Sequence, residues 1–362
     1  MSQMDYNEIR NSQPGVVGQA LQLAGRVFSP PEQLDCGEIG MVSGQAVIEA
    51  GRRYDELTGG NCHPQLAALV FDATGDFRAL DFYFPIVNSL KADPAAREDF
   101  YNAVRYIAGH PGLDLRIYAE NRQDVTAQTP PAVRHIVAGH LSEVFFYRRD
   151  IVERLLSQPR HFRIYTNREA FNQDGGLAGG DYNFGMEAIQ LEMSRLFEGF
   201  SGKTPGVAPF LHELGHMLDH FEAGTGRMGQ CEGVLPGMTG RDGPVFTPQA
   251  RQYFIAGKQL EQQRYLAFQH GQARPNDPVP VGHPYVFQTD GEFIAGFLEM
   301  FFRNPNYFAA QNPQLYQAFA ELLRQDPRRY WPEDFNLYIT ENRKAYLGGE
   351  RPHPQNISIP RY

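Results

Sequence analysis

HELGHMLD, residues 212–219, is the most informative stretch of this chain, because it opens with the pattern His-Glu-x-x-His. With 11 histidines in 362 residues, chance produces this pattern on the order of 0.02 times per chain. Residues four apart on a helix differ by about 40° in direction, so His212 and His216 point toward one ion. Glu213 projects about 100° away from His212, where it accepts a proton from a metal-bound water. The pattern predicts a zinc-binding helix; the alternative is two surface histidines on an amphipathic helix.

A catalytic zinc ion takes three protein ligands and keeps one position open, so the motif needs a third ligand. His220 is one candidate, but it lies too far along the same helix to complete a tetrahedron easily. Glu292 is the better candidate, because small residues follow it at i+3 and i+4 in an expected helix over 291–303 and permit close approach. Its alternative role is an N-terminal charge that the helix dipole favours. Glu299 lies on the same helix face and is a candidate acceptor beside the ligands.

Two segments carry a family resemblance. HELGHMLD resembles the HEF[AG]HxxD run of the Mlc titration factor A (MtfA) family and of the anthrax lethal factor catalytic domain. The segment YVFQTDGEFIAGFLEMFF, residues 285–302, is similar to the family's Tyr-x6-Glu-Phe-Phe-Ala-x3-Glu-x-Phe-Phe. PQLY at 313–316 and RQDP at 324–327 resemble its C-terminal helices. The match covers roughly residues 188–330, and residues 1 to about 130 match no family.

The resemblance implies three ligands for one zinc ion per chain, which are His212, His216 and Glu292. It implies that Glu213 is the general base and that Tyr285 donates a hydrogen bond to the tetrahedral oxyanion. The alternative for Tyr285 is an ordinary loop aromatic. Asp219 is implied to orient a ligand histidine through its far ring nitrogen. Lethal factor has a carboxylate four residues after its ligand glutamate, whereas this chain has Gly296 at that position. Glu299, seven residues after Glu292, matches the second acid of the MtfA type.

The expected fold class is α+β. It consists of a zincin-like metallopeptidase domain over 131–347, with a small mixed sheet, the HExxH helix and the helix that bears Glu292. A mostly helical N-terminal region of unknown role, residues 1–130, precedes it, and a flexible tail follows at 348–362. Capping and periodicity predict helices at 94–106, 132–156, 210–221, 247–269, 291–303 and 313–324. Alternation predicts strands at 161–166 and 188–192, the second being either an edge strand that pairs with substrate or an interior strand.

Composition limits the partners. Lys and Arg number 33 against 42 Asp and Glu, a formal net charge of −9, which predicts no nucleic-acid partner and no anionic membrane surface. No run approaches about 18 consecutive apolar residues, so no transmembrane helix is expected. The polar start of the chain lacks the features of a signal peptide. Cys36, Cys62 and Cys231 are widely spaced, which is typical of a reducing, cytoplasmic location.

The predicted function is zinc-dependent hydrolysis of peptide bonds, in which Glu213 activates a zinc-bound water. The partner is a peptide or protein substrate, with a regulatory protein as an additional partner. Two alternatives stay open. One is a partner-binding protein that sequesters a repressor on a zincin scaffold with vestigial peptidase activity. The other is an effector protease of the lethal-factor kind, exported by a non-classical route.

Overall fold

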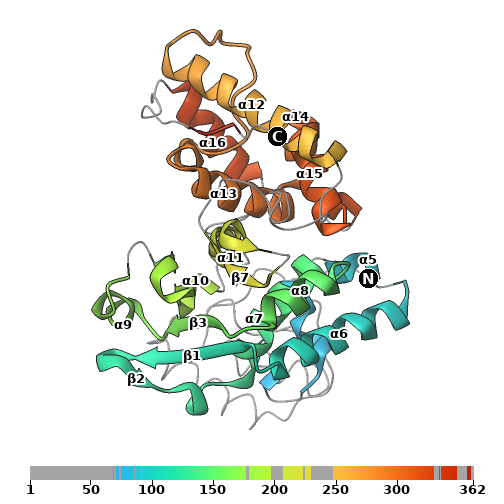
Figure 1. Cartoon of the computed structure of the whole chain (residues 1–362), viewed down its shortest axis with the longest axis vertical. Coiled ribbons are helices and arrows are strands. Elements are labelled where there is room, and N and C mark those ends of the chain that lie inside the picture. The colour runs from blue at the N-terminus through green and yellow to red at the C-terminus, as the bar shows by residue number, and fades with distance from the viewer. Residues whose placement is uncertain are drawn as a thin grey trace, which may run out of the picture. The chain divides into compact units, whose positions relative to one another are not determined.

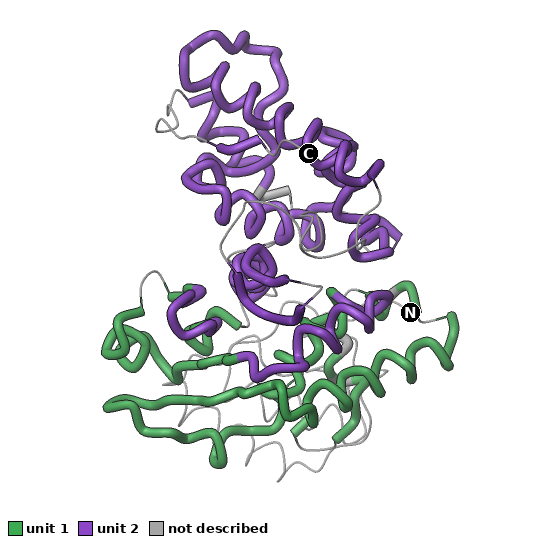
Figure 2. Tube along the Cα trace, viewed as in Figure 1, with its two compact units in different colours: residues 1–144, 161–181, 190–204 green, residues 145–160, 182–189, 205–362 purple. Residues whose placement is uncertain are grey.

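The structure is a computed structural model. It describes residues 68, 71–72, 75–84, 86–90, 92–176, 179–196, 207–222, 225–229, 248–329, 334, 336–348 and 357–359. The chain divides into two compact units that interleave in sequence (Figure 2). Unit 1 comprises Met1–Val144, His161–Asp181 and Gln190–Thr204. Unit 2 comprises Phe145–Arg160, Tyr182–Ile189 and Pro205–Tyr362.

The described residues form a small mixed sheet together with many helices, which confirms the α+β class. The strand order of this sheet is β2-β1-β3-β5-β4, and β1 pairs antiparallel with β2. Figure 1 labels β1, β2 and β3. The strands are β1 Leu113–Ala119, β2 Gln123–Asp124, β3 Arg160–Tyr165, β4 Gly180–Asn183 and β5 Ala188–Glu192. The sequence predicted β3 and β5. It did not predict β1 and β2, which lie in the region expected to be mostly helical.

Strand β5 is an interior strand, so the prediction that residues 188–192 form an edge strand was wrong. β5 lies between β3 and β4, and β4 occupies the edge. Four consecutive residues of β5 are buried, including Gln190, whose amide donates to the Tyr165 hydroxyl at 3.0 Å. A half-buried edge strand would bury every second residue, so alternation in AIQLE was misleading.

Helix α6, Pro94–Gly109, shows why the helix starts were predictable in unit 1. The Asp93 carboxylate accepts hydrogen bonds from the amides of Ala95 and Ala96, and Pro94 occupies the first turn. The helix runs three residues further than predicted. The other helical segments that lie wholly or mainly in unit 1 are η1 Phe77–Tyr83, α5 Ile86–Leu90, η2 Glu120–Arg122, η3 Thr126–Gln128, α7 Pro131–Phe145, α9 Arg168–Gln173 and α10 Met193–Leu196.

The single helix predicted over 132–156 is two helices, α7 and α8, the latter spanning Arg149–Leu156. Arg148 interrupts it with a non-helical backbone. Its buried guanidinium binds the Asp150 carboxylate at 2.8 Å and the Leu322 carbonyl at 2.5 Å. Hydrophobic periodicity continues through such a break, because both helices bury apolar faces. The prediction of one helix was therefore wrong.

Helices dominate unit 2 (Figure 1). The helices predicted over 210–221, 247–269, 291–303 and 313–324 are confirmed, with ends that agree to within one or two residues. Besides α8, its helices and its two short strands are η4 Phe184–Met186, α11 Pro209–His220, β6 Phe221–Glu222, β7 Arg227–Met228, α12 Pro248–Gln269, η5 Pro284–Phe287, α13 Asp290–Arg303, α14 Pro305–Gln311, α15 Pro313–Leu323, η6 Pro327–Arg329 and α16 Asn336–Leu347.

Glycines allow two pairs of helices in unit 2 to approach closely. A Cβ added at Gly215 of α11 would lie 2.5 Å from the Ala295 Cα of α13. A Cβ added at Gly257 of α12 would lie 2.5 Å from the backbone nitrogen of Leu315 in α15. Phenylalanine rings of α13, α14 and α15 pack on one another, as in the pair Phe297 and Phe308, whose centroids are 5.2 Å apart.

Residues 357–359 contact α12 and the start of α13. The other residues of the predicted tail lie outside the described part, apart from residue 348. Ile357 is buried, and its carbonyl accepts a hydrogen bond from Gln262 at 2.7 Å. The Ser358 amide donates to Asp290 at 3.0 Å, and the buried Lys258 ammonium binds the same carboxylate at 2.8 Å. These contacts fix the first turn of α13.

Several sequence predictions fall outside the described residues. The three cysteines and the polar start of the chain are among them. The borders at 130 and 347 stay predictions. Among the helices in the described part of the chain, none is both long enough and apolar enough to span a bilayer.

Candidate metal centre

Helix α11 supplies two imidazoles to one side of unit 2. Pro209 starts the helix, and its apolar face, which includes Leu214 and Leu218, is buried. His212 and His216 are neighbours on the remaining face, with ring centroids 5.0 Å apart. Each side chain is 16–18% exposed, so both rings are held in place yet reachable from solvent.

Helix α13 brings a carboxylate to the same point. The Thr289 hydroxyl caps the helix by accepting from the Glu292 amide at 3.1 Å, which fixes the turn that carries this glutamate. One Glu292 oxygen lies 3.0 Å from His212 Nε2 and 3.4 Å from His216 Nε2. The three donor atoms all lie within 4.8 Å of one another. The predicted ligand trio is therefore brought together.

The spacing of these donor atoms fits a small divalent ion. A tetrahedral ion with bonds of about 2.0–2.1 Å holds its ligand atoms about 3.3 Å apart. The two carboxylate-to-imidazole distances, 3.0 and 3.4 Å, lie close to that value. Two imidazoles and one carboxylate are also a donor set that zinc accepts while leaving a fourth position open.

The ionisable groups of the centre are strongly coupled. Burial lowers the pKa of His212, but hydrogen bonds with Glu292 and Glu299 outweigh it and raise that pKa to about 10. Burial opposes the charge on Glu292, yet its hydrogen bonds with His212 and His216 hold its pKa well below the usual range. Without an ion, the site is therefore an imidazolium–carboxylate pair.

Glu213 and Tyr285 lie beside the three donors. Glu213 is buried on α11, next to His212. Tyr285 belongs to η5 and is 46% exposed, and its hydroxyl donates to the second oxygen of Glu292 at 3.0 Å. Burial raises the pKa of the Tyr285 phenol, and the charges of Glu292 and Glu213 add to this effect. The charge of Glu213 also raises the pKa of His212, and its catalytic role stays a prediction.

Glu299 connects the two helices behind the donors. One of its oxygens accepts from the Ala208 amide, at the start of α11, at 2.6 Å. The other lies 3.5 Å from His212 Nδ1, the ring nitrogen that faces away from Glu292. Glu299 therefore holds the far side of His212, and the contact with the helix start is one that the sequence did not predict.

Asp219 is buried three residues after His216, and its predicted role stays a prediction.

His220 belongs to a different cluster, so the alternative that makes it the third ligand was wrong. Its Nδ1 lies 3.0 Å from the Gly229 carbonyl oxygen. Its ring stacks on Phe184 with centroids 4.5 Å apart and also contacts Tyr182. Among the described residues, the one group of potential ligands that converges consists of His212, His216 and Glu292.

No protein-family model matches the chain, and no curated protein matches it. The resemblance to the MtfA family therefore rests on its sequence motifs alone.

Proposed function

We propose that this protein is a zinc-dependent peptidase of the zincin type. The observation that carries the proposal is the convergence of His212, His216 and Glu292 from α11 and α13, at distances that suit one ion. The motifs that resemble the MtfA family lie on the two helices that bear these donors. Glu213 and Tyr285 supply the acid–base and hydrogen-bonding groups that peptide hydrolysis needs.

His212, His216 and Glu292 would hold the ion. A bound zinc ion lowers the pKa of a water ligand to near 7 and polarises a carbonyl oxygen. Glu213 accepts the proton of the attacking water and then gives it to the amine nitrogen as the carbon–nitrogen bond breaks. Tyr285 releases Glu292 and donates its hydroxyl hydrogen bond to the oxygen of the scissile carbonyl. Glu299 meanwhile keeps His212 oriented.

The change Glu213→Gln tests this proposal. It removes the proton acceptor and leaves all three donors in place, so zinc content should stay the same while peptide cleavage falls about 100- to 10,000-fold. Cleavage of a diverse peptide mixture by zinc-loaded protein, followed by mass spectrometry, measures the loss. Glu341→Gln is the control, because Glu341 is an exposed glutamate of α16 in the same unit. Equal cleavage by the two variants, or none by the unmodified protein, would contradict the proposal.

A further inference from the structure

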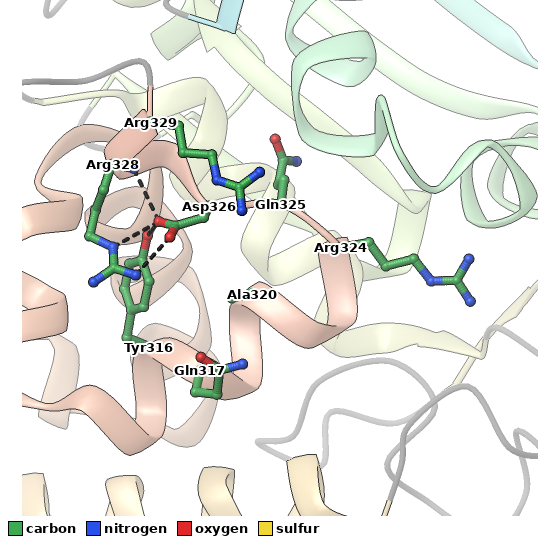
Figure 3. A pocket seen from close by; sticks show the side chains of 8 residues that line it. All are labelled: Tyr316, Gln317, Ala320, Arg324, Gln325, Asp326, Arg328 and Arg329. Carbon is green, nitrogen blue, oxygen red and sulfur yellow. Dashed lines mark hydrogen bonds and ion pairs between the residues drawn. The ribbon is translucent and has the colours of Figure 1, made fainter. Parts of the chain in front are cut away.

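A pocket of about 310 Å³ lies at the C-terminal end of α15 and along the turn that follows (Figure 3). It belongs to unit 2 and shares no residue with the metal centre. Three arginines line it, Arg324, Arg328 and Arg329, together with one acidic residue, Asp326. Such a concentration of positive charge is unexpected in a chain whose formal net charge is −9.

The acidic residue of the pocket is already neutralised. Arg328 binds the Asp326 carboxylate with Nε at 2.8 Å and Nη2 at 2.6 Å, and the Tyr316 hydroxyl donates to it at 2.6 Å. Burial opposes the charge on Asp326, but these contacts outweigh it and keep its pKa below the usual value. Asp326 and Arg328 therefore cancel, which leaves two positive charges in the pocket.

Those two charges belong to Arg324 and Arg329, both exposed. In the part of the chain that the structure describes, no carboxylate pairs with Arg329. The charge of Arg324 helps to lower the pKa of Asp150, but Arg148 already binds that carboxylate at 2.8 Å. Arg329 extends among the other labelled side chains in Figure 3, whereas Arg324 extends outward. The Arg324 guanidinium therefore needs a rotation of its side chain to reach a ligand in the pocket.

The backbone at Arg324 gives a second reason to assign a role to this side chain. Arg324 ends α15 in the left-handed region, with φ 52° and ψ 35°. Glycine is the usual residue at such a helix end, because a side chain is strained there. Arg324 therefore lines the pocket at a conformational cost that glycine would avoid.

We propose that this pocket binds the phosphate group of a small polar molecule. Two guanidinium groups match the double charge of a phosphate monoester, and arginine is the side chain best suited to phosphate oxygens. The volume of about 310 Å³ exceeds that of phosphate alone, so the pocket has room for a polar organic group. Tyr316 is buried beneath the Arg328 guanidinium, 5.0 Å from its ring centroid, and offers no face on which a nucleobase would stack.

Calorimetric titration of the full chain tests the proposal, with inorganic phosphate and glycerol 3-phosphate as probes. The dissociation constant is expected to lie below about 1 mM. For glycerol 3-phosphate it should fall from pH 5.5 to 7.5, because a phosphate monoester loses its second proton at about pH 6. Tighter binding of glycerol 3-phosphate identifies a phosphate ester as the ligand. Equal binding of both probes identifies free phosphate, which is the same chemistry.

Variants separate the pocket from general attraction to a positive charge. The double change Arg324→Gln with Arg329→Gln should weaken phosphate binding at least about tenfold. Arg343→Gln removes one exposed arginine from α16 in the same unit and should leave binding within about twofold. Melting temperatures of the variants verify folding. The proposal is overturned if neither probe binds at about 10 mM, or if the double variant binds as well as the unmodified protein.

Discussion

His212 and Glu292 change one another's proton affinity across 3.0 Å. The raised pKa of His212, about 10, stabilises the ion-free folded protein below about pH 6.5, the value of an unperturbed histidine. That contribution is lost as the pH rises through the folded-state pKa. The lowered pKa of Glu292 has the opposite pH dependence. Its contribution to stability is complete above about pH 4.3 and is lost as the pH falls from there through the lowered folded-state pKa. The ion-free centre is therefore most stable in mildly acidic solution.

Metal binding is expected to strengthen as the pH rises. The ion needs the unprotonated Nε2 of His212, so each bound ion displaces one proton over the range in which this imidazole is charged. Affinity should increase about tenfold per pH unit between about pH 6 and 8. Zinc titrations against a chelator at three pH values measure the slope. An affinity that stays flat once the chelator's own ionisation is subtracted would contradict the coupling.

Glu299 is expected to be a positioning residue for the metal centre. Glu299→Ala removes both the acceptor for the Ala208 amide and the partner of His212, so zinc affinity should fall about 10- to 100-fold. Glu299→Gln keeps an oxygen for the Ala208 amide and loses only the charge. Its zinc affinity should therefore lie between those of the alanine variant and the unmodified protein. Chelator competition and thermal unfolding together separate the two effects. The assignment fails if the alanine variant loses stability while its zinc affinity is unchanged.

At the scale of elements, the metal centre depends on the close contact of α11 and α13. Gly215 lies one residue before His216, and Ala295 lies three residues after Glu292. The Cβ that glycine lacks would fall 2.5 Å from the Ala295 backbone. The distance between the helices and the distance between the donors are therefore set by the same contact.

Gly215→Ala is expected to separate the two helices. The added methyl group meets backbone, which cannot rotate aside, so unfolding free energy should fall by about 1–3 kcal/mol. Zinc affinity should fall as well, because Glu292 moves with α13. Gly109→Ala at the end of α6 is the matched control, since nothing lies within 4 Å of its added Cβ. Denaturant unfolding of the two variants checks the prediction, and similar behaviour would contradict it.

The predictable elements were those whose ends depend on local chemistry. Asp93 with Pro94 and Thr289 with Glu292 cap their helices through contacts within a few residues, so α6 and α13 could be located from the sequence. The convergence of α11 and α13 was inferred from small residues and ligand chemistry. The break at Arg148 depends on Leu322, 174 residues away, and no local pattern reveals such a contact. Likewise, only strand pairing distinguishes interior β5 from an edge strand.

Some features of the sites escaped prediction for the same reason. The hydrogen bond between Glu299 and the Ala208 amide spans 91 residues, and His220 is held by Gly229 and by the Phe184 ring rather than by a metal. One feature of the sequence indicates the arginine pocket, namely the high density of charged residues in RQDPRR at 324–329. Its significance depends on knowing that Asp326 pairs with Arg328.

At the scale of the whole molecule, all three converging donors belong to unit 2. Zinc should therefore stabilise unit 2 directly, by about 2.7 kcal/mol when its free concentration is 100 times the dissociation constant. Hydrogen exchange with and without zinc measures this effect. Protection should rise in α11 and α13 and change little in β1 and α6 of unit 1. Uniform protection of both units, or none in α13, would contradict the assignment of the ligands.

The contact of Gly215 with Ala295 also has a consequence for how the gene can change. Every glycine codon begins with two guanines, and any substitution in either of them encodes an amino acid with a Cβ or a stop. At Gly215 each such Cβ falls against the Ala295 backbone, whereas at Gly109 it enters open space. Codon 109 can therefore accept substitutions at its first two bases, while codon 215 is confined to silent changes at its third base.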